Sequence, residues 1–339
     1  MAAKSFFPGS NTCRGFHGYF DELLPDDATE RAYIIKGGPG VGKSTLMKRV
    51  GAAWEKQGRQ VEYYCCSGDP TSLDAVVSGG RMLMDGTAPH VMDPVLPGAA
   101  DGILNLGVCL DERVMALHRD EALALGRDIK RCYARAYRYL AGADAAWRDS
   151  AAIYQQAVDF GALCNLRMEL QAFLAGAAGR VQHAYAQAIT CEGVVSHAQS
   201  LVCEDMVCLD LPFGFDADCI LRPLSLYLAA QGAGHRAFMQ PLDGKRHAHI
   251  ISGQRAVVTF AEPGRSMRTL PFDEGLLRRE HDTLAFNRAA YDLFMRQAVE
   301  SLHLAKEKHD TLERLYADAM DYRRLEELAA EVMDVMGGR

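Results

Sequence analysis

The feature that most constrains the fold is a glycine-rich segment that follows a short apolar run. It comes directly after residues 31–36 and reads Gly37-Gly38-Pro39-Gly40-Val41-Gly42-Lys43-Ser44-Thr45. In the next segment, residues 45–57, Leu46, Val50 and Trp54 recur at four-residue spacing. This period predicts a helix, and a short apolar run that ends at glycines is typical of a buried strand. A strand, a glycine-rich turn and a helix in this order predict an α/β fold.

The glycine-rich segment fits the pattern G-x-x-x-x-G-K-[ST], the P-loop motif. Glycines permit positive φ angles, so successive amide groups can point at an anion. The dipole of the following helix also favours negative charge. We expect Lys43 to reach the β- and γ-phosphates of a nucleoside triphosphate, and Ser44 to bind Mg²⁺. The alternative is a glycine-rich turn that binds no ligand.

The segments that follow extend the α/β pattern. Residues 61–66 and 81–85 are expected to be strands, with a turn at 67–70 and a short helix at 72–77 between them. Strands that alternate with helices favour parallel pairing. We therefore expect a parallel sheet of the P-loop NTPase type.

Beyond this sheet the pattern becomes helical. Residues 89–107 are rich in proline and glycine, which predicts a long loop. Alanine, leucine, arginine and tyrosine dominate residues 111–179, where we expect a long helical hairpin with a break near Gly142-Ala143-Asp144. The hairpin is a candidate surface for a protein partner.

The order of elements then repeats at a displacement of about 175 residues. Residues 206–209, 236–239 and 256–260 match the three strands, and residues 221–230 match the helix after the glycine-rich loop. The sequence therefore predicts an internal duplication. The first domain covers residues 1–180, with its hairpin at about 111–179, and the second covers 181–339, with its hairpin at about 276–336.

The second copy of the loop, residues 212–219, has lost the residues that bind phosphate. Asp218 stands where Lys43 would recur, Cys219 stands where Ser44 would recur, and Gly214 is the only glycine in the segment. A carboxylate at the lysine position would repel phosphate. We expect the second domain to be degenerate, with the active site in the N-terminal half.

Asp85 is the candidate for a second Mg²⁺ contact, because it ends the apolar run 81–85. The alternative is a turn aspartate. Glycine follows it, whereas many ATPases have there a glutamate that orients the attacking water. Asp69 and His90 are the candidates for a catalytic base. Each is equally well explained as a loop residue, since Asp69 precedes a proline and favours a turn.

Composition limits the possible partners. Apolar residues make up 49% of the chain and charged residues 24%, and the net charge is -7. No apolar run approaches the roughly 20 residues that span a membrane, and no basic run indicates a nucleic-acid partner. The N-terminal residues are polar, without the apolar stretch of a secretory signal, so we expect a cytoplasmic protein. The ten cysteines contain no CxxC motif and are expected to be reduced.

These motifs resemble a family of bacterial P-loop ATPases that carry two tandem P-loop NTPase halves and are grouped with nucleotide kinases. The resemblance is carried by residues 11–16, 35–48, 67–74 and 85–90, and in the rest of the chain by the order of the expected elements. It implies ATP as the nucleotide. Members often carry a glycine-lysine loop in the second half as well, and this chain departs from them at residues 212–219.

The leading hypothesis is Mg²⁺-dependent ATP binding and hydrolysis at one site in the N-terminal half. One alternative is a small-molecule or nucleotide kinase, with Asp69 as the base for an acceptor hydroxyl. Another is a scaffold that binds ATP without catalysis. The chain has no N-K-x-D motif of the kind that often selects guanine, which favours ATP over GTP.

Overall fold

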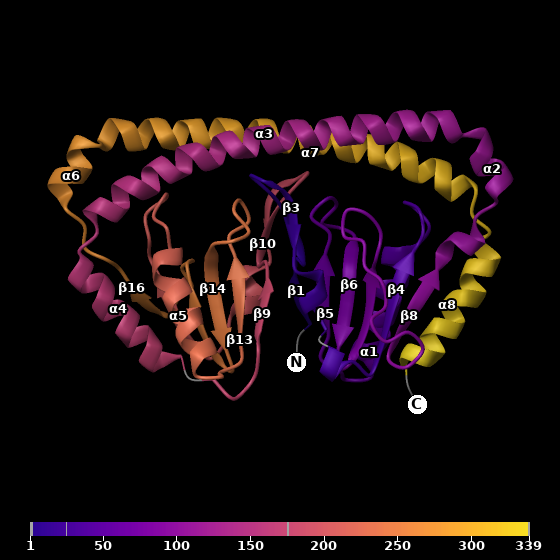
Figure 1. Cartoon of the computed structure of the whole chain (residues 1–339), viewed down its shortest axis with the longest axis horizontal. Helices are drawn as coiled ribbons and strands as arrows, with labels where there is room; N and C mark the ends of the chain where they lie inside the picture. The colour runs from indigo at the N-terminus through magenta and orange to yellow at the C-terminus, as the bar shows by residue number, and fades with distance from the viewer. Residues whose placement is uncertain (1–2, 25, 175, 338–339) are drawn as a thin grey trace.

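Two six-stranded mixed sheets lie side by side beneath a pair of long helices (Figure 1). The computed structural model describes residues 3–24, 26–174 and 176–337. Residues 1 and 2, which belong to the N-terminal segment considered for a secretory signal, lie outside the described residues. The chain is α/β, as the sequence predicts.

The first sheet contains the strand that precedes the glycine-rich loop. Its strands are, in spatial order, β1 (Lys4–Phe6), β5 (Glu62–Cys65), β6 (Leu73–Ser78), β7 (Arg81–Asp85), β4 (Arg31–Lys36) and β8 (Asp101–Asn105). β4 is parallel to both of its neighbours, β7 and β8. β6 is antiparallel to β5 and to β7. The loop after β4 therefore leaves the sheet at the same edge as the ends of β7 and β8.

The second sheet repeats the first in strand order and direction. Its strands are, in the same spatial order, β9 (Val181–Ala184), β13 (His235–Met239), β14 (His247–Ser252), β15 (Arg255–Val258), β12 (Asp205–Leu209) and β16 (Ser266–Arg268). β14 is antiparallel to both neighbours, as β6 is. The other pairs are parallel. The predicted duplication of the α/β arrangement agrees with this topology.

The two sheets meet through their first strands. Phe7 follows β1 and Tyr185 follows β9, and each donates its amide to the carbonyl of the other at 2.9 Å. Glu62 and Arg236 pair across the junction at 3.0 Å. Apart from the α-helices and the two sheets, the described residues form two hairpins and four short 3₁₀ turns. The hairpins are β2 (Gly9–Thr12) with β3 (Gly15–Gly18) and β10 (Gln187–Thr190) with β11 (Gly193–Ser196), and the turns are η1 (Phe20–Glu22), η2 (Asp26–Ala28), η3 (Leu106–Cys109) and η4 (Ala198–Leu201).

The helices also occur as two matching sets. The first set is α1 (Lys43–Lys56), α2 (Glu112–Leu117), α3 (Arg119–Ala157) and α4 (Phe160–Phe173). The second set is α5 (Asp218–Ala230), α6 (Glu274–Arg279), α7 (His281–Asp318) and α8 (Tyr322–Gly337). α3 and α7 lie along each other and cross above both sheets (Figure 1).

Each half of the chain sends its last helix to the sheet of the other half. α4 packs on α5 of the second half, where Leu170 and Leu224 share one core. α8 packs on α1 of the first half, where the buried Trp54 donates its indole N–H to the Met336 carbonyl at 2.8 Å. The exchanged helices α4 and α8 therefore add packing contacts between the two halves.

The expected helical hairpins are wrong, because α3 pairs with α7 rather than folding back on its own half. The expected break near residues 142–144 is also wrong, since α3 continues through it. Along α3, Ala136, Leu140 and Ala143 are fully buried at spacings of four and three residues, the pattern of two helices packed in parallel or antiparallel register. Gly142 lies within this helix, where the absence of a side chain leaves room for the Phe294 ring of α7.

Two further expectations about the first sheet are wrong. The sheet is mixed rather than parallel, because the short helix predicted at residues 72–77 is replaced by the antiparallel strand β6, which begins at Leu73. Every residue of β6 is buried, which is what a central strand covered on both faces requires. The loop predicted at 89–107 contains the edge strand β8, which pairs with β4.

Among the helices that the structure describes, none combines the length and the apolar character needed to cross a bilayer. α3 and α7 are long enough, but charged residues occur along both of them.

Candidate functional site

The candidate site begins at the loop between β4 and α1, residues 37–42. Gly40 has a φ angle of 70° and Gly42 has one of 90°, both in the left-handed region that favours glycine. Gly42 is the residue that precedes α1, so the loop ends at the N-terminus of a 14-residue helix. This geometry points backbone amides and the positive end of a helix dipole toward one place.

Lys43 is the first residue of α1, and its side chain folds back over the loop. Its Nζ donates to the carbonyl oxygens of Gly37 and Gly38 at 2.9 and 2.8 Å. It also lies 3.4 Å from Asp85 Oδ2, and both side chains are largely buried. The ammonium group is thus held at the mouth of the loop by neighbours that a more strongly charged anion can replace.

Ser44 contacts the first residue of β6, and Asp85 ends the neighbouring strand β7. Ser44 Oγ accepts a hydrogen bond from the Leu73 amide at 3.0 Å. Asp85 Oδ1 accepts hydrogen bonds from the amide and hydroxyl of Thr87 at 2.9 and 2.7 Å. The side chain of Asp85 is therefore oriented by its own turn while its second oxygen faces Lys43.

Asp74 belongs to this group, although the sequence analysis assigned it no role. Asp74 follows Leu73 on β6. The next residue, Ala75, pairs with Met84 of the antiparallel strand β7, so the register places Asp74 opposite Asp85. Its side chain is only 4% exposed. Burial, followed by the charge of Asp85, raises the pKa of its carboxyl to about 7. Two adjacent carboxylates beside a serine hydroxyl are a donor set suited to a divalent cation.

His90 lies near the same group, in the loop after β7. Its ring stacks on Phe20, with the ring centroids 4.1 Å apart. Neither ring nitrogen has a hydrogen-bond partner among the described residues. Burial lowers its pKa to about 4, with the charges of Asp85 and Lys43 acting in opposite directions. The imidazole is therefore neutral at physiological pH and free to accept a hydrogen bond.

Asp69 lies at the rim of the site, in the turn after β5. Its Oδ1 accepts hydrogen bonds from the amide and hydroxyl of Thr71 at 3.0 and 2.7 Å. Its Oδ2 lies 3.3 Å from Nζ of Lys306, a residue of α7. Burial raises its pKa, but the hydrogen bonds from Thr71 and the charge of Lys306 outweigh burial, and the pKa lies below its ordinary value. Asp69 is thus an ionised carboxylate that is already paired.

α7 and α8 pack directly on the glycine-rich loop. A Cβ atom on Gly38 would lie 2.3 Å from the ring of Tyr316, and one on Gly40 would lie 2.6 Å from the carbonyl oxygen of Glu313. A Cβ atom on Gly42 would lie 3.2 Å from the side chain of Leu325 in α8. The glycines therefore serve both the curvature of the loop and its contact with these helices.

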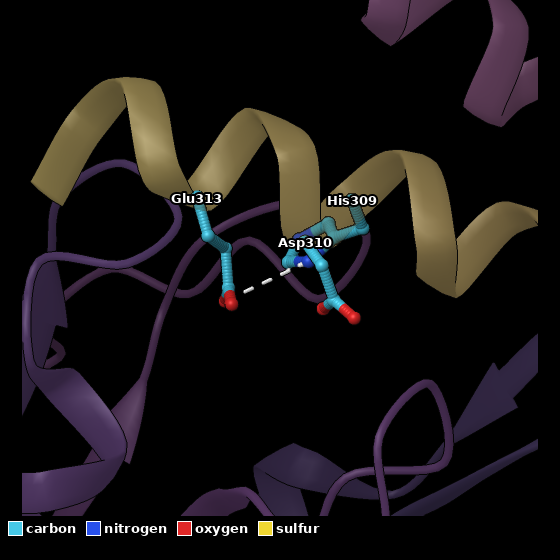
Figure 2. A group of neighbouring side chains, drawn as sticks. All are labelled: His309, Asp310 and Glu313. Carbon is cyan, nitrogen blue, oxygen red and sulfur yellow. Dashed lines mark ion pairs between the residues drawn. The ribbon is translucent and has the colours of Figure 1, made fainter.

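The side of α7 that faces the first sheet carries a group of polar residues. Figure 2 shows His309, Asp310 and Glu313 extending from the helix toward the N-terminal half. Their ligand atoms lie within 4.8 Å of one another, so they are a second group that could hold a metal. Both carboxylates are already paired, Glu313 with His309 at 3.6 Å and Asp310 with Lys306. Lys306 also pairs with Asp69, so this one cation contacts two carboxylates.

The corresponding loop of the second half has a different conformation. α5 begins at Asp218, as α1 begins at Lys43, but the preceding residue is Ala217 with a φ angle of -60°. Asp218 accepts hydrogen bonds from the amide and the Nδ1 of His247, both at 2.8 Å. Burial raises its pKa, but the bonds from His247 and Arg222 outweigh burial and lower it to about 2. An ionised carboxylate thus occupies the position of Lys43.

Internal ion pairs occupy the rest of the second site. Asp243 is 3% exposed and lies 2.8 Å from Arg14, 3.1 Å from Arg148 and 3.3 Å from Arg246. Arg148 also pairs with Asp144 of α3. The carboxylate of Asp243 is thus surrounded by three arginines of the protein itself.

Two open surface pockets lie away from the glycine-rich loop. One lies between the β10–β11 hairpin and α7, and the other is lined by residues of α3, α6 and α7 together with Phe213. Comparisons with family models, curated proteins and solved structures found no match to this chain.

Proposed function

We propose that the N-terminal half binds ATP together with Mg²⁺ at residues 37–45 and hydrolyses it to ADP and inorganic phosphate. The observation that carries this proposal is the arrangement of Lys43, Ser44, Asp74 and Asp85 around the N-terminus of α1. One cation, one hydroxyl and two carboxylates beside a glycine-rich loop match the requirements of a Mg²⁺-bound triphosphate. In this reading the chain is a duplicated P-loop NTPase whose second half is degenerate.

The phosphates take over the interactions that hold Lys43 in the free protein. A phosphate oxygen carries more charge than the carbonyls of Gly37 and Gly38, so Nζ exchanges them for the β- and γ-phosphates. The backbone amides of the loop between Gly38 and Lys43 then donate hydrogen bonds to the same phosphate oxygens. Binding energy comes from groups that the fold has already placed.

Ser44, Asp74 and Asp85 are the residues that would hold Mg²⁺. The buried Asp74 fits this role because its pKa is raised beside Asp85, and a cation between the two carboxylates would remove that repulsion. When bound, the ion neutralises charge on the β- and γ-phosphate oxygens. Asp85 keeps its orientation through the two hydrogen bonds from Thr87.

The neutral imidazole of His90 is suited to orient the attacking water. It accepts a hydrogen bond from the water at a ring nitrogen that otherwise lacks a partner. The water oxygen bonds to the γ-phosphorus while the bond from that phosphorus to the β–γ bridging oxygen breaks. The electron pair of the broken bond stays on ADP, and the water gives up its protons to the phosphate product and the solvent. A weak base is sufficient, because phosphoryl transfer depends more on positioning than on proton abstraction.

The product formed from ATP distinguishes this function from its two alternatives. The chain is incubated with Mg²⁺-ATP, and free phosphate and ADP are measured. We expect phosphate release that depends on Mg²⁺ and disappears in Lys43→Ala. ADP formed without free phosphate, in the presence of a hydroxyl acceptor, would indicate a kinase instead. ATP binding with neither product would indicate a scaffold.

A further inference from the structure

Lys306 is a cation that the second half places at the rim of the first half's site. It lies on α7, which begins above the second sheet and ends above the first (Figure 1). Its Nζ lies 3.3 Å from Asp69 Oδ2 and also pairs with Asp310 one turn further along the helix. Both Lys306 and Asp69 keep 23% of their side-chain surface exposed, so the pair is accessible to a ligand.

The internal duplication identifies the residue that replaces Lys306 in the second half. α3 begins at Arg119 and α7 at His281, a displacement of 162 residues (281 minus 119). The same displacement relates the buried Leu140 to the buried Leu302, which confirms the register. It relates Lys306 to Asp144. The position that carries a cation over the first site therefore carries a carboxylate over the second.

Two positions that carry a lysine in the first half thus carry an aspartate in the second. Asp218 replaces Lys43 at the start of the helix, and Asp144 replaces Lys306 on the covering helix. The second half then needs Arg148 between Asp144 and Asp243 to balance the added negative charge. The same displacement relates Asp310 to Arg148, so the ion pair one helical turn apart occurs in both halves with its charges exchanged. The first half therefore combines Lys43 at the start of α1 with a cation at position 306 of the covering helix, and the second half has a carboxylate at both corresponding positions.

We propose that Lys306 leaves Asp69 for the γ-phosphate of bound ATP and acts as a catalytic residue supplied by the other half of the chain. This inference rests on the proposed function. Negative charge on the γ-phosphate oxygens must be stabilised as the bond to the bridging oxygen breaks, and a second cation opposite Lys43 serves that need. Asp69 positions Lys306 until the triphosphate arrives. ADP lacks the γ-phosphate, so it leaves the pair with Asp69 intact.

The test compares Lys306→Ala with the matched control Lys308→Ala. Lys308 lies on the same helix, but its Nζ faces Asp128 of α3 at 3.5 Å. Calorimetric titration in Mg²⁺ measures the affinity for ADP and for a slowly hydrolysed ATP analogue. We expect Lys306→Ala to lose at least tenfold in affinity for the analogue and less than twofold for ADP. Phosphate release at saturating ATP should fall at least a hundredfold, and Lys306→Arg should recover part of both losses. Lys308→Ala should behave as the wild type.

The outcomes separate this inference from the function on which it rests. If Lys306→Ala keeps both its affinity for the analogue and its phosphate release, Lys306 is a structural residue and the inference is wrong, while the proposed function stands. If the wild-type chain binds neither nucleotide, both are wrong. Equal losses for ADP and for the analogue would show that Lys306 does not contact the γ-phosphate.

Discussion

The buried Asp74 makes a direct prediction about how stability depends on pH. Its pKa is 3.8 in an unfolded chain and about 7 in the folded protein without ligand. The folded state therefore holds a proton that the unfolded state has lost, and stability falls as the pH rises from about 4 to 7. Each pH unit in that window costs about 1.4 kcal/mol, which amounts to as much as about 4 kcal/mol at pH 8.

Asp74→Asn removes this penalty because an amide does not ionise. Urea unfolding at pH 5 and pH 8 measures the effect. We expect the variant to exceed the wild type in unfolding free energy by several kcal/mol at pH 8 and by much less at pH 5. Asp93→Asn is the control, since the Asp93 side chain is 78% exposed and its ion pair with Lys36 lies at the surface, so the change in stability should be small.

Mg²⁺ with nucleotide should cancel the same penalty in the wild type, because a cation beside Asp74 and Asp85 stabilises both ionised carboxylates. If the difference between Asp74→Asn and the wild type does not change with pH, the Asp74 carboxyl is ionised without cost. The two carboxylates would then need no cation between them.

Three further substitutions test other parts of the site. Asp85→Asn should retain nucleotide binding but weaken its dependence on Mg²⁺, measured by titration with and without the ion, and an unchanged dependence would reduce Asp85 to a turn residue. His90→Ala should bind the ATP analogue normally and lose at least tenfold in phosphate release, so normal turnover would exclude it as the residue that orients water. Gly40→Ala places a Cβ atom 2.6 Å from the Glu313 carbonyl at a φ angle of 70°. It should cost about 1–2 kcal/mol and accelerate amide exchange in residues 306–316, and unchanged exchange would refute the contact with α7.

The sequence predicted the strands around the glycine-rich loop because their apolar runs are continuous. Residues 31–36 and 81–85 form β4 and β7 with the predicted bounds. It failed at residues 72–77, because Leu73, Val76 and Val77 have the spacing of a helical face as well as that of a buried strand. Burial on both faces of the sheet selects the strand. Since Asp74 lies within this segment, the same error concealed it.

Contacts between distant segments could not be predicted from local patterns. α3 and α7 each show an apolar stripe, but a stripe does not reveal which helix covers it. Lys306 and Asp69 are 237 positions apart (306 minus 69), and no motif links them. The internal repeat offered one sequence signal for Lys306, because aligning the two long helices by their first residues places Lys306 opposite Asp144.

The number of nucleotide sites tests the central claim most directly. A carboxylate at the position of Lys43 would repel a phosphate by about 4 kcal/mol at 4 Å and an effective dielectric of 20, and the loop before Asp218 lacks the conformation of the first loop. Calorimetric titration with Mg²⁺ and a slowly hydrolysed ATP analogue should therefore give one site per chain in the wild type and none in Lys43→Ala. Two sites, or one that survives Lys43→Ala, would contradict the account.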